Sequence, residues 1–131
     1  MEETVQKILK AQDTRTQLYK EFEEALKANH EKTIGLEQMG IVVQLVTEGL
    51  NEVSLDIRKF QADLGSSRLQ SYVDQLQELE HSKLRKTIKI EQLSLPSNIE
   101  DNHSEIEQLK EEIHATIMKI NDTIQSIKDE L

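Results

Sequence analysis

The sequence predicts an all-α fold, an elongated up-down bundle of three long helices followed by a fourth, coiled-coil-like helix. One proline and four glycines in 131 residues leave little turn chemistry for a sheet. Glutamate, lysine, leucine, glutamine and isoleucine abound, which is typical of long helices. Apolar residues recur at a heptad spacing in successive stretches of the chain. We predict a three-helix core at residues 1–94, a linker at 95–102 and a C-terminal coiled-coil helix at 103–131.

The first stretch predicts a helix whose packed face contains polar residues. Two sets of positions at heptad spacing, offset by three or four residues, share one face of a helix. They are Val5, Gln12, Tyr19 and Leu26 in one set and Ile8, Arg15, Phe22 and Asn29 in the other. Gln12 and Arg15 stand where apolar side chains are expected, so we predict a polar layer here.

The second stretch predicts the core helix, because its seam is apolar throughout. The seam consists of Met39, Val46, Val53 and Phe60 with Val43, Leu50, Ile57 and Leu64. Gly49 lies inside this helix, where glycine costs about 1 kcal/mol relative to alanine. Either a neighbouring backbone approaches closely there, or the glycine is exposed and tolerated.

The third stretch begins after Gly65 and Ser66, with Ser67 and Gln70 spaced as a capping box. We predict a helix from there to about Leu93. Its seam is polar midway and consists of Leu69, Val73, Leu76, Glu80, Lys83, Thr87 and Ile90.

The segment from Leu95 to Asn102 predicts a boundary, because Pro96 stops a helix and either Ser97 or Asn102 can start the next. In the last helix, isoleucine in both heptad sets suits a higher-order bundle. This helix packs either on its own chain or on a partner. Its candidate partner-binding seam, which is also a candidate surface for self-association, consists of Ile106, Ile113, Ile117, Ile120, Ile124 and Ile127; Lys110 and Leu131 complete the two sets.

The polar positions of the first and third helices predict a buried ion pair. In an up-down bundle these helices run parallel, and Arg15 and Glu80 both lie about 13 residues from their helix starts, at a depth of roughly 20 Å. Gln12, Lys83 and Thr87 extend the same layer. The layer either fixes the packing register, at little net stability, or has a functional role.

Residues of this layer carry a resemblance to a family. The stretches "LKAQDTRTQLYKEFEEA", "VTEGLNEVSLDI" and "LQELEHSKLRKT" together resemble the required-for-excision B domain, a small helical family named for a DNA excision-repair phenotype. The resemblance covers roughly Val5 to Leu93 and rests on helical spacings. It implies a nuclear protein linked to excision repair, without a defined enzymatic activity. The residues that mark the family are Gln12, Arg15, Tyr19, Phe22, Glu80, Lys83 and Thr87.

Composition disfavours several other classes of protein. A formal charge of −9 disfavours direct nucleic-acid binding, and the basic cluster of Lys83, Arg85, Lys86 and Lys89 is better explained as a solvated helix face. The absence of cysteine excludes disulfides and thiol catalysis. The four histidines lack metal-site spacing, and neither a phosphate loop nor a nucleophile motif occurs. We therefore expect neither an enzyme nor a cofactor.

Signals for the secretory route are not supported by the sequence, and the expected nuclear location is what the family resemblance implies. No run approaches the roughly 18 apolar residues of a membrane span, and residues 1–10 lack the apolar region of a signal peptide. The final "KDEL", Lys128 to Leu131, is therefore interpreted as coincidental. We expect a nuclear location, with a cytoplasmic one as the second possibility.

The helical seams predict a non-enzymatic helical adaptor that binds protein partners through its helical faces, and the family resemblance implies that it takes part in DNA excision repair. The alternative is a structural coiled-coil subunit of a cytoplasmic tether or spindle-type assembly, which an acidic heptad chain suits equally well.

Overall fold

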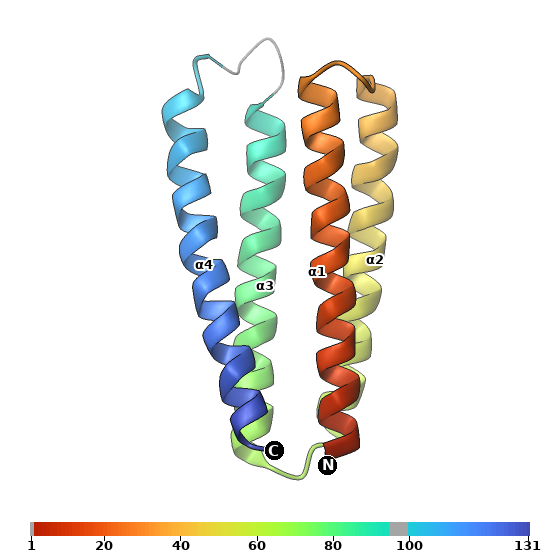
Figure 1. Ribbon diagram of the computed structural model, residues 1–131, viewed down its shortest axis with the longest axis vertical. Helices are drawn as coiled ribbons and strands as arrows, with labels where there is room; N and C mark the ends of the chain where they lie inside the picture. Colours follow the sequence, from red (N-terminus) through yellow and green to blue (C-terminus); the bar gives the residue numbers. More distant parts are fainter. Residues whose placement is uncertain (1, 95–99) are drawn as a thin grey trace. The chain divides into compact units, whose positions relative to one another are not determined.

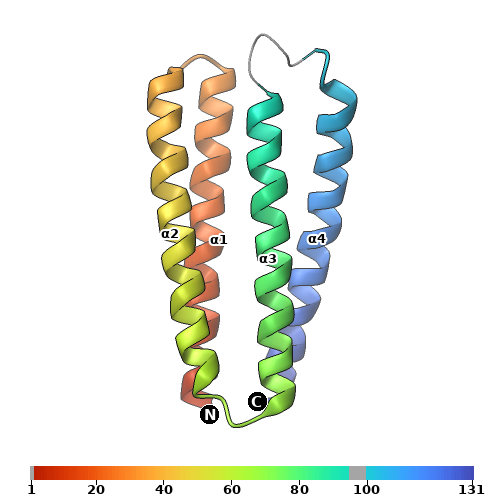
Figure 2. The same cartoon turned by 180° about the vertical axis from the view of Figure 1, so that it is seen from behind.

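A computed structural model of the chain describes residues 2–94 and 100–131 and confirms the all-α class. The described residues form four helices: α1 (Glu2–His30), α2 (Leu36–Ala62), α3 (Ser67–Leu93) and α4 (His103–Asp129). They belong to two compact units, Met1–Gly65 and Ser66–Leu131, each of which is a pair of antiparallel helices (Figures 1 and 2). The fold is therefore built from two helical hairpins.

The first hairpin, α1 with α2, buries the two seams predicted for it. In α2 the buried residues are Met39, Val46, Leu50, Val53 and Ile57, and Val43 and Phe60 are half-buried. In α1 the buried residues are Val5, Ile8, Gln12, Arg15, Tyr19 and Phe22. The seam pattern thus identified the packed face of both helices, including the two polar positions of α1.

The loop between α1 and α2 is held by hydrogen bonds to the last turn of α1. Ala28 O accepts from the backbone N–H and from the hydroxyl of Thr33, both at 2.9 Å. Asn29 Nδ2 donates to Ile34 O at 3.3 Å. Lys32 has a φ of 61°, a left-handed conformation that turns the chain after the helix end. These bonds fix Ile34 beside the end of the hairpin.

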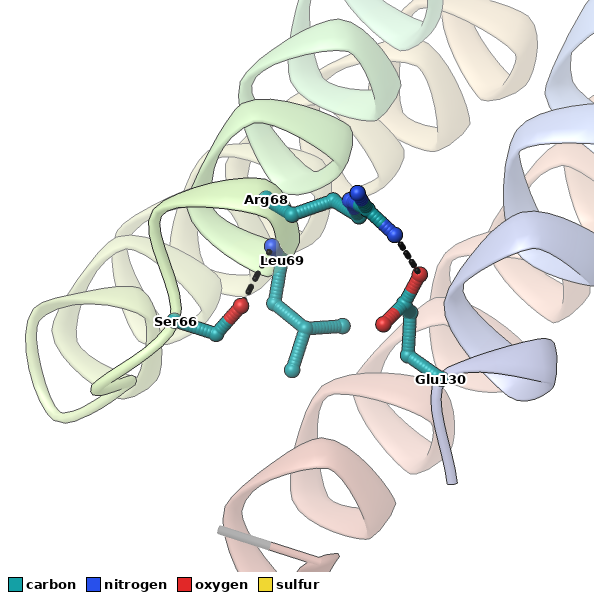
Figure 3. Close-up of polar contacts among 4 residues, drawn as sticks. All are labelled: Ser66, Arg68, Leu69 and Glu130. Atoms are coloured by element: carbon teal, nitrogen blue, oxygen red, sulfur yellow. Dashed lines mark hydrogen bonds and ion pairs between the residues drawn. The ribbon is translucent and has the colours of Figure 1, made fainter.

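The second hairpin, α3 with α4, begins at a serine cap one residue earlier than predicted. Ser66 is the N-cap, and its hydroxyl oxygen accepts from the Leu69 N–H at 3.2 Å (Figure 3). The prediction of Ser67 as the cap was wrong, because Ser66 has the extended backbone, φ −98° and ψ 122°, that aims its hydroxyl at the first turn. Ser67 is the first helical residue.

The buried face of α4 differs in part from the predicted isoleucine seam. Ile106, Ile120 and Ile127 are buried, whereas Ile113, Ile117 and Ile124 are half-buried and Lys110 and Leu131 are exposed. Thr116 and Thr123 are buried, at positions that the prediction assigned to neither heptad set. Their hydroxyls donate to Glu112 O at 2.8 Å and Lys119 O at 2.9 Å, so both threonines enter an apolar seam with their donors satisfied.

Helix α4 begins directly after Asn102, one of the two residues predicted to start it, but the side chain of Asn102 does not cap the helix. Asn102 is the N-cap residue but makes no capping bond to α4; its Nδ2 donates instead to Leu93 O at 3.3 Å, at the end of α3. Pro96 and Ser97 lie outside the described residues, as does most of the predicted linker at 95–102.

The structure groups the helices in pairs. The second unit joins α3 to α4, and these two helices pack against each other as α1 and α2 do. The predicted core at residues 1–94 groups α3 with α1 and α2, across the two units, and stays a prediction, as does the separate C-terminal helix at 103–131.

Two glycines of α2 provide a matched test of the packing in the first hairpin. A Cβ on Gly40 meets no atom within 4 Å, whereas a Cβ on Gly49 lies 3.1 Å from Leu18 Cδ1. The close approach at Gly49 thus comes from a side chain rather than from a backbone. We expect Gly40→Ala to raise the free energy of unfolding by about 1 kcal/mol, the difference in helix propensity.

The same change at Gly49 is expected to gain roughly half as much or less, because Leu18 must shift by a few tenths of an ångström. Urea unfolding followed by circular dichroism measures both variants. Equal gains would contradict the close contact between Leu18 and Gly49.

Candidate functional site

The polar layer of α1 lies on the buried face of the helix. Gln12 is 3% exposed and Arg15 is 2% exposed, and the aromatic rings of Tyr19 and Phe22 are buried on the same face. The buried atoms include Gln12 Oε1 and both Nε and Nη2 of Arg15. A guanidinium placed this deeply is held by the fold and is inaccessible to a substrate in solution.

The polar layer of α3 is centred on Glu80, which is 4% exposed and whose Oε2 is buried. Lys83 and Thr87 follow on the same side of the helix and are half-buried. The Thr87 hydroxyl donates to Lys83 O at 2.7 Å. Arg15 and Glu80 each have an interaction partner in the fold. The ion pair predicted between them joins residues of the two units and stays a prediction.

A second candidate site, which the sequence analysis missed, is an apolar groove at the loop end of the first hairpin. Its volume is about 500 Å³, and it is lined by Leu18, Glu21, Glu24, Ala25, Ala28, Ile34, Val42, Leu45 and Val46. We call it the α1–α2 groove. The small side chains of Ala25 and Ala28 leave the hollow, and the hydrogen-bonded loop places Ile34 beside it.

One signal in the sequence pointed to this groove. Leu45 and Ile41 lie one turn apart on α2 and outside its predicted seam, yet both are large and apolar. In the structure Leu45 is 62% exposed and Ile41 is 54% exposed. Large apolar residues outside the seam of an amphipathic helix are therefore the sequence feature that indicates the groove.

The basic cluster of α3 lies on a partly exposed helix surface, and the end of α4 contacts the start of α3. Arg85 and Lys89 are exposed, and Lys83 and Lys86 are half-buried. The "KDEL" residues lie at the end of α4, and Glu130 Oε1 is 3.4 Å from Arg68 Nη1 of α3 (Figure 3). This contact ties the end of α4 to the start of α3.

The described residues form neither a metal cluster nor a membrane-spanning helix. In residues 2–94 and 100–131, no group of three His, Asp or Glu side chains is arranged to hold a metal ion. Within the same described ranges, no helix has the length and hydropathy required to cross a membrane.

Comparison with known proteins gives two matches. Residues 3–94, which include α2, α3 and all of α1 except Glu2, match the family described as DNA repair REX1-B. The chain is also 58% identical over 132 residues to a protein of Schizosaccharomyces pombe named heterochromatin silencing protein rss1, and the alignment covers the whole of both chains. The family match confirms the resemblance that the polar-layer residues carry.

Proposed function

The chain belongs to the DNA repair REX1-B family, and from this membership we propose that it is a non-enzymatic helical adaptor of the nucleus that takes part in DNA excision repair. The family description supports the repair role. The name of the yeast relative favours a second role, in heterochromatin silencing, because that protein is similar to this chain over its full length. Both roles act on chromatin, and in either one an adaptor would bring other proteins together there.

The burial of the polar layer supports an adaptor rather than an enzyme. Gln12, Arg15 and Glu80 are the most distinctive polar residues of the chain, and all three are buried. An acid, base or nucleophile has to reach its substrate, so residues placed this way serve packing. The exposed surface instead offers long helical faces and the α1–α2 groove, which suit protein partners.

We propose that partners bind to faces of the chain other than the predicted isoleucine seam. Ile106, Ile120 and Ile127 are buried in the chain itself, where α4 packs on α3. A partner that used them would first have to separate the two helices, which exposes the apolar seam of both. Self-association through this seam carries the same cost. The net charge of −9 further favours protein partners over direct nucleic-acid contacts.

The test uses cells that lack the protein, complemented by the wild-type chain at its normal level. We expect slow removal of ultraviolet lesions and derepression of a reporter placed in heterochromatin, with both defects corrected by the wild-type chain. A fluorescent fusion should be nuclear. Normal lesion removal together with normal silencing would overturn the proposal, and a cytoplasmic fusion in a large assembly would instead support a structural coiled-coil subunit.

A further inference from the structure

The strongest unexplained feature of the surface is the apolar strip of α2 beside the α1–α2 groove. Among the described residues, six large hydrophobic side chains are more than half exposed, and four of them lie on α2: Leu36, Ile41, Leu45 and Leu55. Ile41 and Leu45 lie one turn apart and form the apolar strip, whereas Leu36 and Leu55 lie elsewhere on the helix. Leu45 also lines the groove. Single exposed apolar residues are ordinary, but a strip that continues into a hollow is typical of an interaction site.

We propose that the α1–α2 groove binds an amphipathic helix of a partner protein whose apolar face is flanked by lysine and arginine. This inference rests on the proposed adaptor role and names the surface that performs it. The apolar residues come from α1, from α2 and from the loop, as Leu18, Val42 and Ile34 illustrate. The apolar face of the incoming helix would occupy the hollow over Ala25 and Ala28.

Charge complementarity selects a basic partner. Among the described residues that line the groove, the charged ones are Glu21 and Glu24, both exposed on α1. Glu48, one turn after Leu45 on α2, is also exposed and accepts from Gln44 Nε2 at 3.2 Å. Cations on the partner helix would meet these carboxylates at the rim, where complementary charge speeds association and fixes orientation.

The nearby lysines leave this acidic rim in place. Lys20 and Lys27 are exposed residues of α1, and neither lines the groove. Lys27 Nζ lies 4.0 Å from Glu31 Oε1, at the helix end. The charge that faces the hollow is therefore negative.

The backbone around the groove favours a helical partner over an extended one. An extended peptide binds by adding a strand to an open sheet edge, and in the described ranges every element is a helix. A helix needs only an apolar groove with anchors on one face, at positions i, i+3 or i+4, and i+7. The loop that holds Ile34 is already fixed by its bonds to α1, so little ordering is required on binding.

The test selects ligands from a displayed library of random peptides of about 16 residues, roughly four helical turns. The full chain, immobilised, is the bait. We expect enrichment of peptides with Leu, Ile or Phe on one helical face and with Lys or Arg beside it. A fluorescein-labelled peptide of the selected consensus then measures affinity by anisotropy.

Leu45→Ser is expected to weaken binding of that peptide by about tenfold or more, as for a central interface residue. Leu55→Ser is the matched control, since Leu55 is on the same helix, is 57% exposed and does not line the groove; it should change affinity by less than about twofold. Glu21→Lys with Glu24→Lys should weaken binding and flatten its dependence on salt. Circular dichroism verifies that each variant is folded.

Four results with the purified chain would overturn the groove proposal: no enrichment, enrichment of acidic or non-periodic peptides, equal effects of the two leucine variants, or a dimer in sedimentation that Leu45→Ser abolishes. The last result would make a second copy of the chain the occupant. Complementation of cells that lack the protein distinguishes failure of the groove proposal from failure of the proposed function. If cells that lack the protein are defective but Leu45→Ser corrects them fully, the groove proposal fails and the adaptor role stands; if such cells show no defect, the proposed function fails.

Discussion

Replacing Arg15 with methionine is expected to lower the free energy of unfolding by about 3–5 kcal/mol, the usual cost of removing one partner of a buried charged interaction. Arg15 is 2% exposed, and two of its guanidinium nitrogens have essentially no contact with solvent. A charge this deeply buried is retained only where other groups of the fold compensate it. Methionine keeps much of the side-chain volume but leaves those groups buried without their cation.

Arg58→Met provides the control for this measurement, because Arg58 lies on the exposed face of α2 in the same hairpin. It should change stability by no more than about 0.5 kcal/mol. Urea unfolding at neutral pH measures both variants. Equal stabilities for the two variants would show that Arg15 is not held in a buried polar layer.

Replacing Ile120 with alanine is expected to cost about 2–5 kcal/mol, the range for truncation of a large buried aliphatic residue. Ile120 is 4% exposed near the middle of α4, where this helix packs on α3. The loss includes the burial free energy that the deleted methyl and methylene groups supplied and the cost of the cavity left in their place. This substitution therefore measures how firmly α4 is held by its own chain.

Met118→Ala is the matched control, since Met118 is two residues away on the same helix and is 57% exposed. We expect it to change stability by no more than about 0.5 kcal/mol. If Ile120→Ala were as mild as this control, α4 would not be packed by its isoleucines, and the seam would be available to a partner as the sequence first suggested.

Heptad spacing predicted the buried faces of α1 and α2 well, because their seam residues recur at a regular helical period. The seam of α2 has no polar interruption, so its heptad spacing alone identified Leu50 and Ile57 as buried. Gln12 and Arg15 were identified by the same spacing, because their positions in the seam outweighed their polarity. In both cases the position of a residue in the helical period determines whether it is buried, and that position can be read from the sequence.

The features that the sequence did not predict depend on backbone detail and on neighbouring helices. Thr116 can be buried because its hydroxyl donates a hydrogen bond to the carbonyl oxygen of Glu112, and the residue type alone does not predict that bond. Ser66 rather than Ser67 caps α3 because of its backbone angles. The α1–α2 groove is lined by residues of two helices and of the loop between them, among them Ala28, Leu45 and Ile34. Heptad positions within one helix do not show which residues of the other helix lie beside them.

The pairing of helices that follow one another along the chain also sets how the protein folds during synthesis. Each hairpin joins two helices that follow one another in the chain, and helical proteins of this kind fold in microseconds to milliseconds. Ribosomes add about 5–20 residues per second, so synthesis of residues 66–131 takes on the order of several seconds. During that interval α1 and α2 are both available and can pair before α3 is complete. The nascent chain therefore has time to cover the apolar seam of α2 before the second apolar seam is made, which limits the hydrophobic surface that it exposes at any moment.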